Sequence, residues 1–257
     1  MFSSEFKSNL KKLGLKKGDK ILVSSDLLKF LIYLKKNKIN YNLDDFINDL
    51  IEIVGKNGNI FFPTFNWDFC KGVPFNNKKS KSMTGALSNA ALKRNDFVRS
   101  HNPIYSFAIW GKNKNKISKL NHKSCFSLAS PFGYLIKNNA KNLFLGLDYK
   151  DGFTFVHVAE EQVGVKYRHF KYYEGNVINN NKIKKNKIRM YVRDLSKNLV
   201  TTINKKMDKI LKEKKKIRKN NFFGIEFSLI NIKSAYNIMV SDLKKEKKIV
   251  QIKKPKF

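Results

Sequence analysis

Cysteine, proline and acidic side chains are all scarce in this chain of 257 residues. Two cysteines, Cys70 and Cys125, are too few for the disulfide framework of a small secreted domain, so we expect a reducing compartment. The N-terminal segment has no apolar signal core, and no run approaches the roughly 18 apolar residues that span a bilayer. These absences predict a cytoplasmic protein with no membrane span.

The shortage of acidic residues leaves a large positive charge. The chain has 53 Lys and Arg against 20 Asp and Glu, a net charge of +33. The excess is almost all lysine and comes with many Asn, Ile and Phe, which favours A/T-biased coding over selection for nucleic-acid binding. Residues 181–257 hold 24 basic and 6 acidic residues. A non-enzymatic protein that binds polyanions or nucleic acid is therefore the alternative function.

No Pro- or Gly-rich linker and no repeat divides the chain, and the hydrophobic fraction of 42% can bury a real core. We expect one domain over residues 1–257, with the basic part at 181–257 packed on it and shaping the acceptor side of a site.

Hydrophobic periodicity predicts alternating helices and strands. Apolar residues at helical spacing indicate a helix that ends at Gly14, and residues 19–25 read as a buried strand. A helix over 43–55 and a strand over 58–65 follow. This order predicts an α/β fold with a central, mostly parallel or mixed sheet flanked by helices.

The rest of the chain continues the alternation. The patterns predict helices over 82–94, 152–164 and 233–246, a lysine-rich helical segment over 205–219, and strands over 104–111, 141–148, 187–195 and 220–230.

The stretch "DGFTFVHVAEE" places His157 three residues before Glu160 and four before Glu161. On a helix all three share one face, and a carboxylate can fix the tautomer of a histidine that acts as a general base. Spacing alone favours a simpler reading, a structural histidine bonded to its helix neighbour.

Other chemistries have less support. Four histidines without an H-E-x-x-H or C-x-x-C pattern predict no metal site. Cys125 with His157 could form a thiol–base pair, but the apolar "SCFSLASPFG" is typical of a core cysteine. No Gly-rich phosphate loop occurs. Ser24 and Ser25, which follow a strand, could bind an anion at a helix N-terminus or simply cap that helix.

Seven stretches lie in a specific order: "LGLKKGDKILVSSDL", "GNIFFPTFNWDF", "SMTGALSNAALKR", "RSHNPIYSFAIWG", "CFSLASPFGYL", "NLFLGLDYKDGFTFVHVAEE" and "VGVKYRHFK". Together they resemble the aminoglycoside 3-N-acetyltransferase family, acetyl-CoA-dependent enzymes separate from the GNAT fold. The family's Thr-x-x-His-x-x-Glu motif matches Thr154, His157 and Glu160. The resemblance implies that His157 takes a proton from the acceptor amine and that Glu160 orients it.

The resemblance also implies acetyl-CoA as the acetyl donor and direct transfer without an acyl-enzyme. The residues that would line the coenzyme A pocket are Ser24, Ser25, Pro63, Thr64, Arg99, Ser100 and Ser106. Asp148 and Glu161 are the acidic candidates for contact with the acceptor. The expected partners are coenzyme A and a small amino-sugar acceptor, with a homodimer left open and no nucleic acid.

Three departures from the family pattern bear on the acceptor. Asn102 stands where antibiotic-modifying members have histidine, with His101 one place early. Ser127 replaces an expected glycine, and Val23 replaces the first residue of a His-Ser-Ser turn. The chain thus looks more like members associated with surface-polysaccharide synthesis than like antibiotic-resistance enzymes. The implied acceptor is an amino sugar on a nucleotide or lipid carrier, with an aminoglycoside as the other option.

Overall fold

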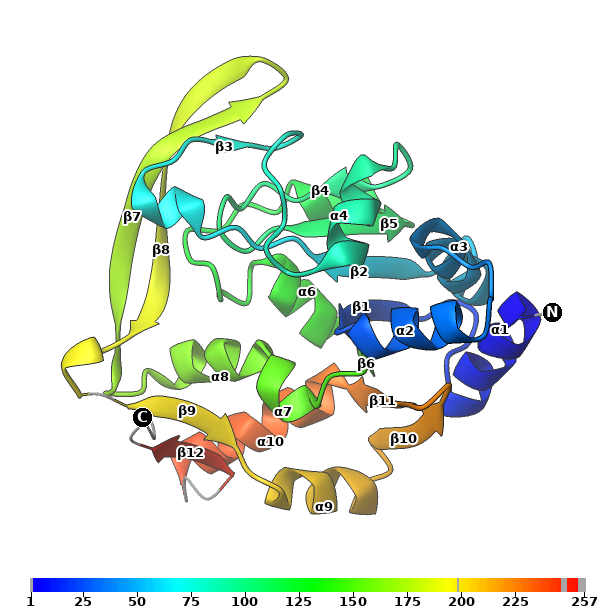
Figure 1. Cartoon of the computed structure of the whole chain (residues 1–257). Coiled ribbons are helices and arrows are strands. Elements are labelled where there is room, and N and C mark those ends of the chain that lie inside the picture. The colour runs from blue at the N-terminus through cyan, green and yellow to red at the C-terminus, as the bar shows by residue number, and fades with distance from the viewer. Residues whose placement is uncertain (1, 198, 246–248, 254–257) are drawn as a thin grey trace.

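The computed structural model describes residues 2–197, 199–245 and 249–253, and its central element is a seven-stranded mixed sheet (Figure 1). The strand order is β10-β11-β6-β1-β2-β5-β4. β1 (Lys20–Ser25) pairs in parallel with β2 (Asn59–Pro63) and β6 (Lys141–Leu145). The outer strands pair antiparallel: β5 (Phe107–Gly111), β4 (Val98–Arg99), β11 (Ile225–Asn231) and β10 (Ile217–Phe222). The expected α/β fold with a mixed sheet is confirmed.

The two faces of the sheet belong to two halves of the hydrophobic core. Successive side chains of a strand point to opposite faces, so Ile21 and Val23 join one half and Leu22 joins the other. The first half includes helices α1 (Phe2–Leu13), α2 (Leu28–Lys36), α3 (Leu43–Val54) and α4 (Ala86–Lys93). The second includes α6 (Pro131–Lys137), α8 (Phe155–Val163) and α10 (Ile232–Lys244).

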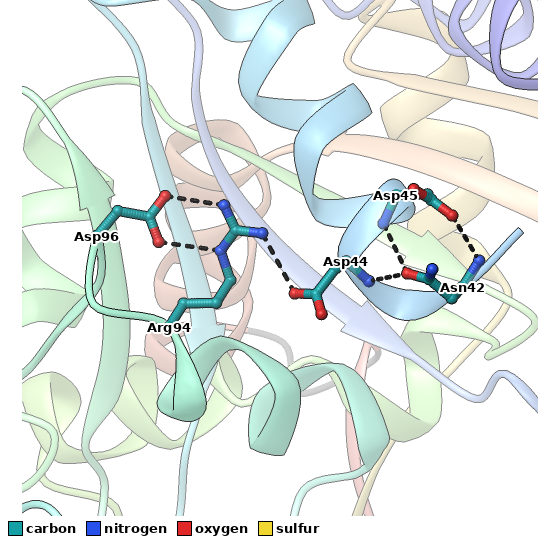
Figure 2. A network of polar contacts seen from close by, with 5 residues as sticks. All are labelled: Asn42, Asp44, Asp45, Arg94 and Asp96. Carbon is teal, nitrogen blue, oxygen red and sulfur yellow. Dashed lines mark hydrogen bonds and ion pairs between the residues drawn. The ribbon is translucent and has the colours of Figure 1, made fainter.

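A polar network fixes α3 and α4 to each other (Figure 2). The Asn42 side chain accepts hydrogen bonds from the N–H groups of Asp44 and Asp45, and Asp45 accepts one from the Asn42 N–H, which forms a capping box. Arg94, just after α4, donates two bonds of 2.9 Å to Asp96 and one of 3.2 Å to Asp44. The start of α3 and the end of α4 are therefore held together.

The carboxyl ends of β1 and β6 meet at one edge of the sheet. Asp26 N–H donates to Leu145 O at 2.9 Å, directly after both strands end. Gly146 follows with a φ of +64°, and a Cβ at this position would lie 2.4 Å from Asp26 O. Only glycine fits this close approach. Ligands of open α/β sheets bind at such carboxyl edges.

A long hairpin stands on the side of the molecule opposite α1 and α3 (Figure 1). It consists of β7 (Arg168–Asn179) and β8 (Lys182–Arg193), with β3 (Phe75–Asn76) beside β7. Its two-residue turn places Asn180 and Asn181 at positive φ, which asparagine tolerates.

The remaining elements complete the described chain. β9 (Val200–Ile203) pairs with β12 (Val250–Lys253). The short helices are α5 (Lys114–Ser118), α7 (Tyr149–Gly152) and α9 (Lys206–Glu213), and 3-10 turns cover Asp68–Lys71 and Leu195–Lys197. Across the described ranges, no helix is long and apolar enough to cross a membrane.

Most expected elements are confirmed, and three differ. The lysine-rich helical segment expected over 205–219 is helical only as far as Glu213, and β10 begins at Ile217. The strand expected over 220–230 is a tight hairpin, because Phe223 and Gly224 adopt positive φ between β10 and β11. The strand β7 was not predicted at all. None of its residues is fully buried, and Phe170, Tyr172 and Tyr173 follow one another too closely to give the alternation of apolar and polar residues that signals a strand.

Candidate active site

A cavity of about 600 Å³ lies at the carboxyl edge of the sheet. Ser24, Ser25 and Pro63 line it from the ends of β1 and β2. The first turns of α2, α4 and α8 also line the cavity. The further lining residues are Leu22, Asp26, Leu27, Leu28, Leu31, Phe65, Trp67, Thr84, Gly85, Ala86, Tyr105, Leu147, Gly152, Thr154 and His157. We call this space the first cavity; none of the described residues lining it is Lys or Arg.

A second cavity, of about 480 Å³, lies beside the hairpin. Its lining comes mainly from β7, β8 and the turn after β8, with Phe126 from the loop before α6. Tyr105 and His157 line both cavities. His157 therefore stands where two separately built binding spaces meet.

The orientation of His157 is fixed by Glu160, one helical turn away. Nδ1 of His157 lies 2.8 Å from Glu160 Oε2, and the glutamate side chain is fully buried. An ionised carboxylate can only accept a hydrogen bond, so in the neutral imidazole Nδ1 carries the proton and Nε2 has the lone pair. The imidazole keeps 29% of its surface exposed, enough for contact with a substrate.

Glu160 is itself held by three further groups. Tyr167 and Thr201 donate hydroxyl hydrogen bonds to Oε1 at 2.9 and 2.7 Å, and Arg168 Nε lies 2.7 Å from Oε2. Burial alone would raise the pKa of Glu160, but the bond from His157 and the charge of Arg168 hold it below the ordinary value. The carboxylate therefore stays ionised beside the histidine.

Helix α8 places these groups through its own packing. Phe155, Val158 and Ala159 are buried in the core, which turns His157 toward the cavities. Thr154 occupies the N-cap position, yet its side chain makes no capping hydrogen bond. Its hydroxyl remains available at the first cavity, which it lines.

The residues expected to contact coenzyme A fall into two groups. Ser24, Ser25 and Pro63 line the first cavity. The other four, Thr64, Arg99, Ser100 and Ser106, are buried and do not line it.

Those four side chains brace the strands behind Pro63. Arg99 donates to Ser106 Oγ at 2.9 Å and to Thr64 O at 2.8 Å, and Ser100 Oγ accepts from Phe107 N–H at 2.9 Å. Burial lowers the pKa of Arg99 to about 10. A direct contact of these side chains with coenzyme A stays a prediction.

The two acidic candidates for the acceptor lie outside the lining of both cavities. Asp148 caps α7 through the Lys150 N–H at 3.0 Å and pairs with the Lys150 side chain. Glu161 accepts a hydrogen bond of 2.6 Å from Ser124 Oγ, and burial raises the pKa of its carboxyl. Their contact with an acceptor stays a prediction.

Two departures from the family pattern have local explanations. Asn102 Oδ1 accepts from the N–H groups of Ile104 and Tyr105, both at 2.8 Å, which fixes the turn that presents Tyr105 to the cavities. Ser127 has a negative φ, so its position does not require the glycine. Its hydroxyl accepts from Ala129 N–H at 3.1 Å and supports the local turn.

The thiol alternative has no geometric support. Cys125 is 1% exposed and lines neither cavity, and burial raises the pKa of its thiol well above the ordinary value. A thiolate is the nucleophilic form, and it is disfavoured here.

Several residues of the site were not singled out from the sequence. Tyr105, Tyr167 and Arg168 all lie within stretches that carry the family resemblance, but they have no distinctive spacing. Thr201 follows the hairpin, 41 positions after Glu160, and nothing in its sequence context marks it.

Comparison with known proteins gives a consistent result. The family model for aminoglycoside 3-N-acetyltransferases matches residues 33–244. A prophage-derived aminoglycoside N(3')-acetyltransferase-like protein of Bacillus subtilis (strain 168), YokD, is 31% identical over 179 residues, which are 60% of this chain and 63% of the relative.

Solved structures share the fold. The aminoglycoside acetyltransferase AAC(3)-Xa superposes with a TM-score of 0.75 at 18% identity, covering 93% of this chain and 91% of the other. AAC-IIIb in its binary complex with CoASH also has a TM-score of 0.75, at 17% identity over 95% and 96% of the two chains. The Bacillus subtilis YokD structure reaches 0.75 at 20% identity, over 96% and 94%.

Proposed function

This chain belongs to the aminoglycoside 3-N-acetyltransferase family, and we propose that it transfers the acetyl group of acetyl-CoA to the amine of an amino sugar. One observation carries the proposal: a histidine with a free Nε2 lies where two cavities meet. A transferase that brings two substrates together needs this arrangement.

We assign the first cavity to acetyl-CoA. Its walls are largely apolar, which suits a pantetheine arm, and the N-termini of α2, α4 and α8 line it through Leu28, Ala86 and Thr154. The Leu28 N–H is bonded to Asp26 Oδ1 and the first turn of α8 has bonds of its own, so α4, which has no side-chain cap, offers the open terminus. Unpaired N–H groups and the helix dipole make such termini attractive to phosphate. The cavity can therefore take the phosphates of coenzyme A without Lys or Arg in its lining.

The reaction follows from the position of His157. An ammonium is not a nucleophile, so Nε2 of His157 takes a proton as the amine nitrogen attacks the thioester carbonyl carbon. The C–N bond forms, the C–S bond breaks, and the sulfur of coenzyme A leaves as a thiolate that is then protonated. In this proposal Glu160 stabilises the imidazolium, and the hydroxyl of Thr154, which lines the first cavity, donates to the developing oxyanion.

The second cavity then receives the acceptor, a carrier-linked amino sugar or an aminoglycoside. Strand β8 belongs to the basic part at 181–257 and supplies Met190, Tyr191 and Arg193 to this cavity. This supports the proposal that the C-terminal part shapes the acceptor side.

A thermal-shift experiment with acetyl-CoA tests the proposal. Binding at a hundredfold excess over Kd should stabilise the protein by about 2.7 kcal/mol. Absence of stabilisation at saturating acetyl-CoA, combined with steeply salt-dependent binding of nucleic acid, would instead support the polyanion-binding alternative. Release of free thiol with a panel of amino sugars and aminoglycosides then identifies the acceptor.

A further inference from the structure

The second cavity is rich in cations. Arg168, Lys171 and Arg193 line it, against Asp194 as the acidic residue of the same lining. This contrasts with the first cavity, whose described lining has no Lys or Arg. A binding space with such a charge selects the sign of its ligand.

One of these cations, Arg168, and the acidic Asp194 already have partners. Arg168 lies 2.7 Å from Glu160 and donates to Tyr191 O at 3.2 Å, so it serves the His157–Glu160 pair. Asp194 holds the turn after β8 by accepting from Ser196, with 2.6 Å to its hydroxyl.

Lys171 and Arg193 remain. In the part of the chain that the structure describes, neither makes an ion pair with a carboxylate. The Lys171 ammonium lies 5.5 Å from the centre of the Tyr173 ring, and Arg193 is half-buried at the end of β8. Their donors are free to bind an anionic oxygen, which Arg in particular can bind with two parallel hydrogen bonds.

Aromatic rings form the other walls of the second cavity. Tyr105, Phe126, Tyr173 and Tyr191 contribute flat faces. The Tyr191 hydroxyl is occupied by Val165 O at 2.6 Å, so its ring is held in place. Such faces pack against the apolar side of a sugar ring or against a base.

We infer that the second cavity selects an acceptor amine that also carries an anionic group, phosphate or carboxylate, which the positive charges of Lys171 and Arg193 in its lining attract. The inference rests on the proposed function, because it assumes that the amine faces His157. Binding the anionic group in this cavity would hold the amine near Nε2. A polycationic aminoglycoside would bring several ammonium groups toward like charges, which disfavours its binding.

Binding to protein saturated with coenzyme A tests the inference directly, since the first cavity is then filled. The probes are an amino-sugar phosphate, an amino uronate, the parent neutral amino sugar and an aminoglycoside. We expect each anionic probe to bind about tenfold more tightly than the neutral sugar, a difference of about 1.4 kcal/mol. The phosphate and uronate arms show which anion the cavity prefers.

The matched variants are Lys171→Gln/Arg193→Gln and, as control, Lys184→Gln/Lys185→Gln, which removes two lysines of the same hairpin that do not line the second cavity. We expect the first pair to abolish the preference for anionic probes and to leave binding of coenzyme A unchanged. The control should keep the preference.

Equal loss in both variants would mean that anions bind to the general positive surface, and the inference would be wrong. Tightest binding of the aminoglycoside by the wild-type protein would also overturn it, while the proposed acetyl transfer would stand. Failure of coenzyme A itself to bind would refute the proposed function instead, so the two failures can be told apart.

Discussion

The two cavities that meet at His157 differ in how they would attract a charged substrate. The first lies at the edge of the central sheet and offers helix N-termini, serine hydroxyls and apolar walls. The second is formed largely by an exposed hairpin and offers side-chain cations and aromatic rings. Backbone dipoles are fixed by the fold, whereas side-chain charges change with single substitutions. In the proposed function, the donor cavity is thus tied to the fold and the acceptor cavity is open to variation.

Removing His157 should have the largest effect, because it serves both cavities. We expect His157→Ala to lower kcat/KM by about 10²- to 10⁴-fold, the usual contribution of a general base. Stabilisation by coenzyme A should persist, because the ring supplies only part of the first cavity. Thiol-release kinetics and a thermal shift measure the two quantities, and full turnover by the variant would remove His157 from the mechanism.

The second-largest effect should come from breaking the ion pair between Glu160 and Arg168. Glu160→Gln leaves Arg168, whose side chain is 9% exposed, without its carboxylate, so we expect a loss of about 3–5 kcal/mol in unfolding free energy. Glu174→Gln is the control, because Glu174 pairs with Lys187 on the exposed hairpin and its loss should not measurably change stability.

The pH dependence of this loss has a definite sign. The pKa of Glu160 is lowered in the folded protein, so its contribution is complete above the unfolded value of about 4.5. It is lost as the pH falls through the folded pKa. Urea unfolding from pH 7 to pH 4 and below should show the wild-type and Glu160→Gln stabilities converge at the acid end, and a constant difference would contradict the assignment.

Substituting a glycine at the first cavity changes backbone geometry there without changing any charge. Gly85 precedes α4 with φ +102° and ψ 177°, a region open essentially to glycine. Gly85→Ala should raise the KM for acetyl-CoA about tenfold, or about 1.4 kcal/mol, because it distorts a helix N-terminus that lines the first cavity.

Gly55→Ala is the matched control for this substitution. Gly55 ends α3 at φ +61° and ψ 178° and lines neither cavity, so it imposes a similar backbone strain elsewhere. Both variants should be destabilised, and only Gly85→Ala should lose affinity for acetyl-CoA. An equal KM for acetyl-CoA in the two variants would show that the N-terminus of α4 does not bind the donor.

Ionic strength should have the smallest effect on KM, but that effect should differ between the acceptor and acetyl-CoA. Raising ionic strength from about 0.01 M to 1 M shortens the screening length from about 30 to 3 Å. The KM of an anionic acceptor should rise several-fold, and that of acetyl-CoA should rise less, because helix N-termini and not Lys or Arg line its cavity. Steady-state kinetics at several salt concentrations measure both slopes, and identical slopes would remove the proposed difference between the cavities.

The same contrast explains what could be predicted from the sequence. The first cavity is lined by strand ends and helix starts, each from a short segment of the chain, so Ser24, Ser25, Pro63 and Thr154 could be named by matching short motifs to the family pattern. The pair His157 and Glu160 is also local, since one helical turn joins them.

The acceptor side could not be predicted in the same way. Lys171 and Arg193 line one cavity only because β7 pairs with β8, and no residue of β7 is fully buried to reveal it as a strand. Arg193 also lies in the basic C-terminal part, where Lys and Arg are so frequent that no single one can be recognised as functional from the sequence. The sequence also could not predict that Arg99 and Thr64 are buried and bonded to each other, because burial of polar groups depends on packing between distant strands.

The most direct test of the two-cavity account is a crystal structure with coenzyme A bound. The account predicts that the pantetheine arm occupies the first cavity, that its sulfur points toward Nε2 of His157, and that the second cavity stays open to solvent. A pantetheine arm lying in the second cavity, or a sulfur remote from His157, would contradict it.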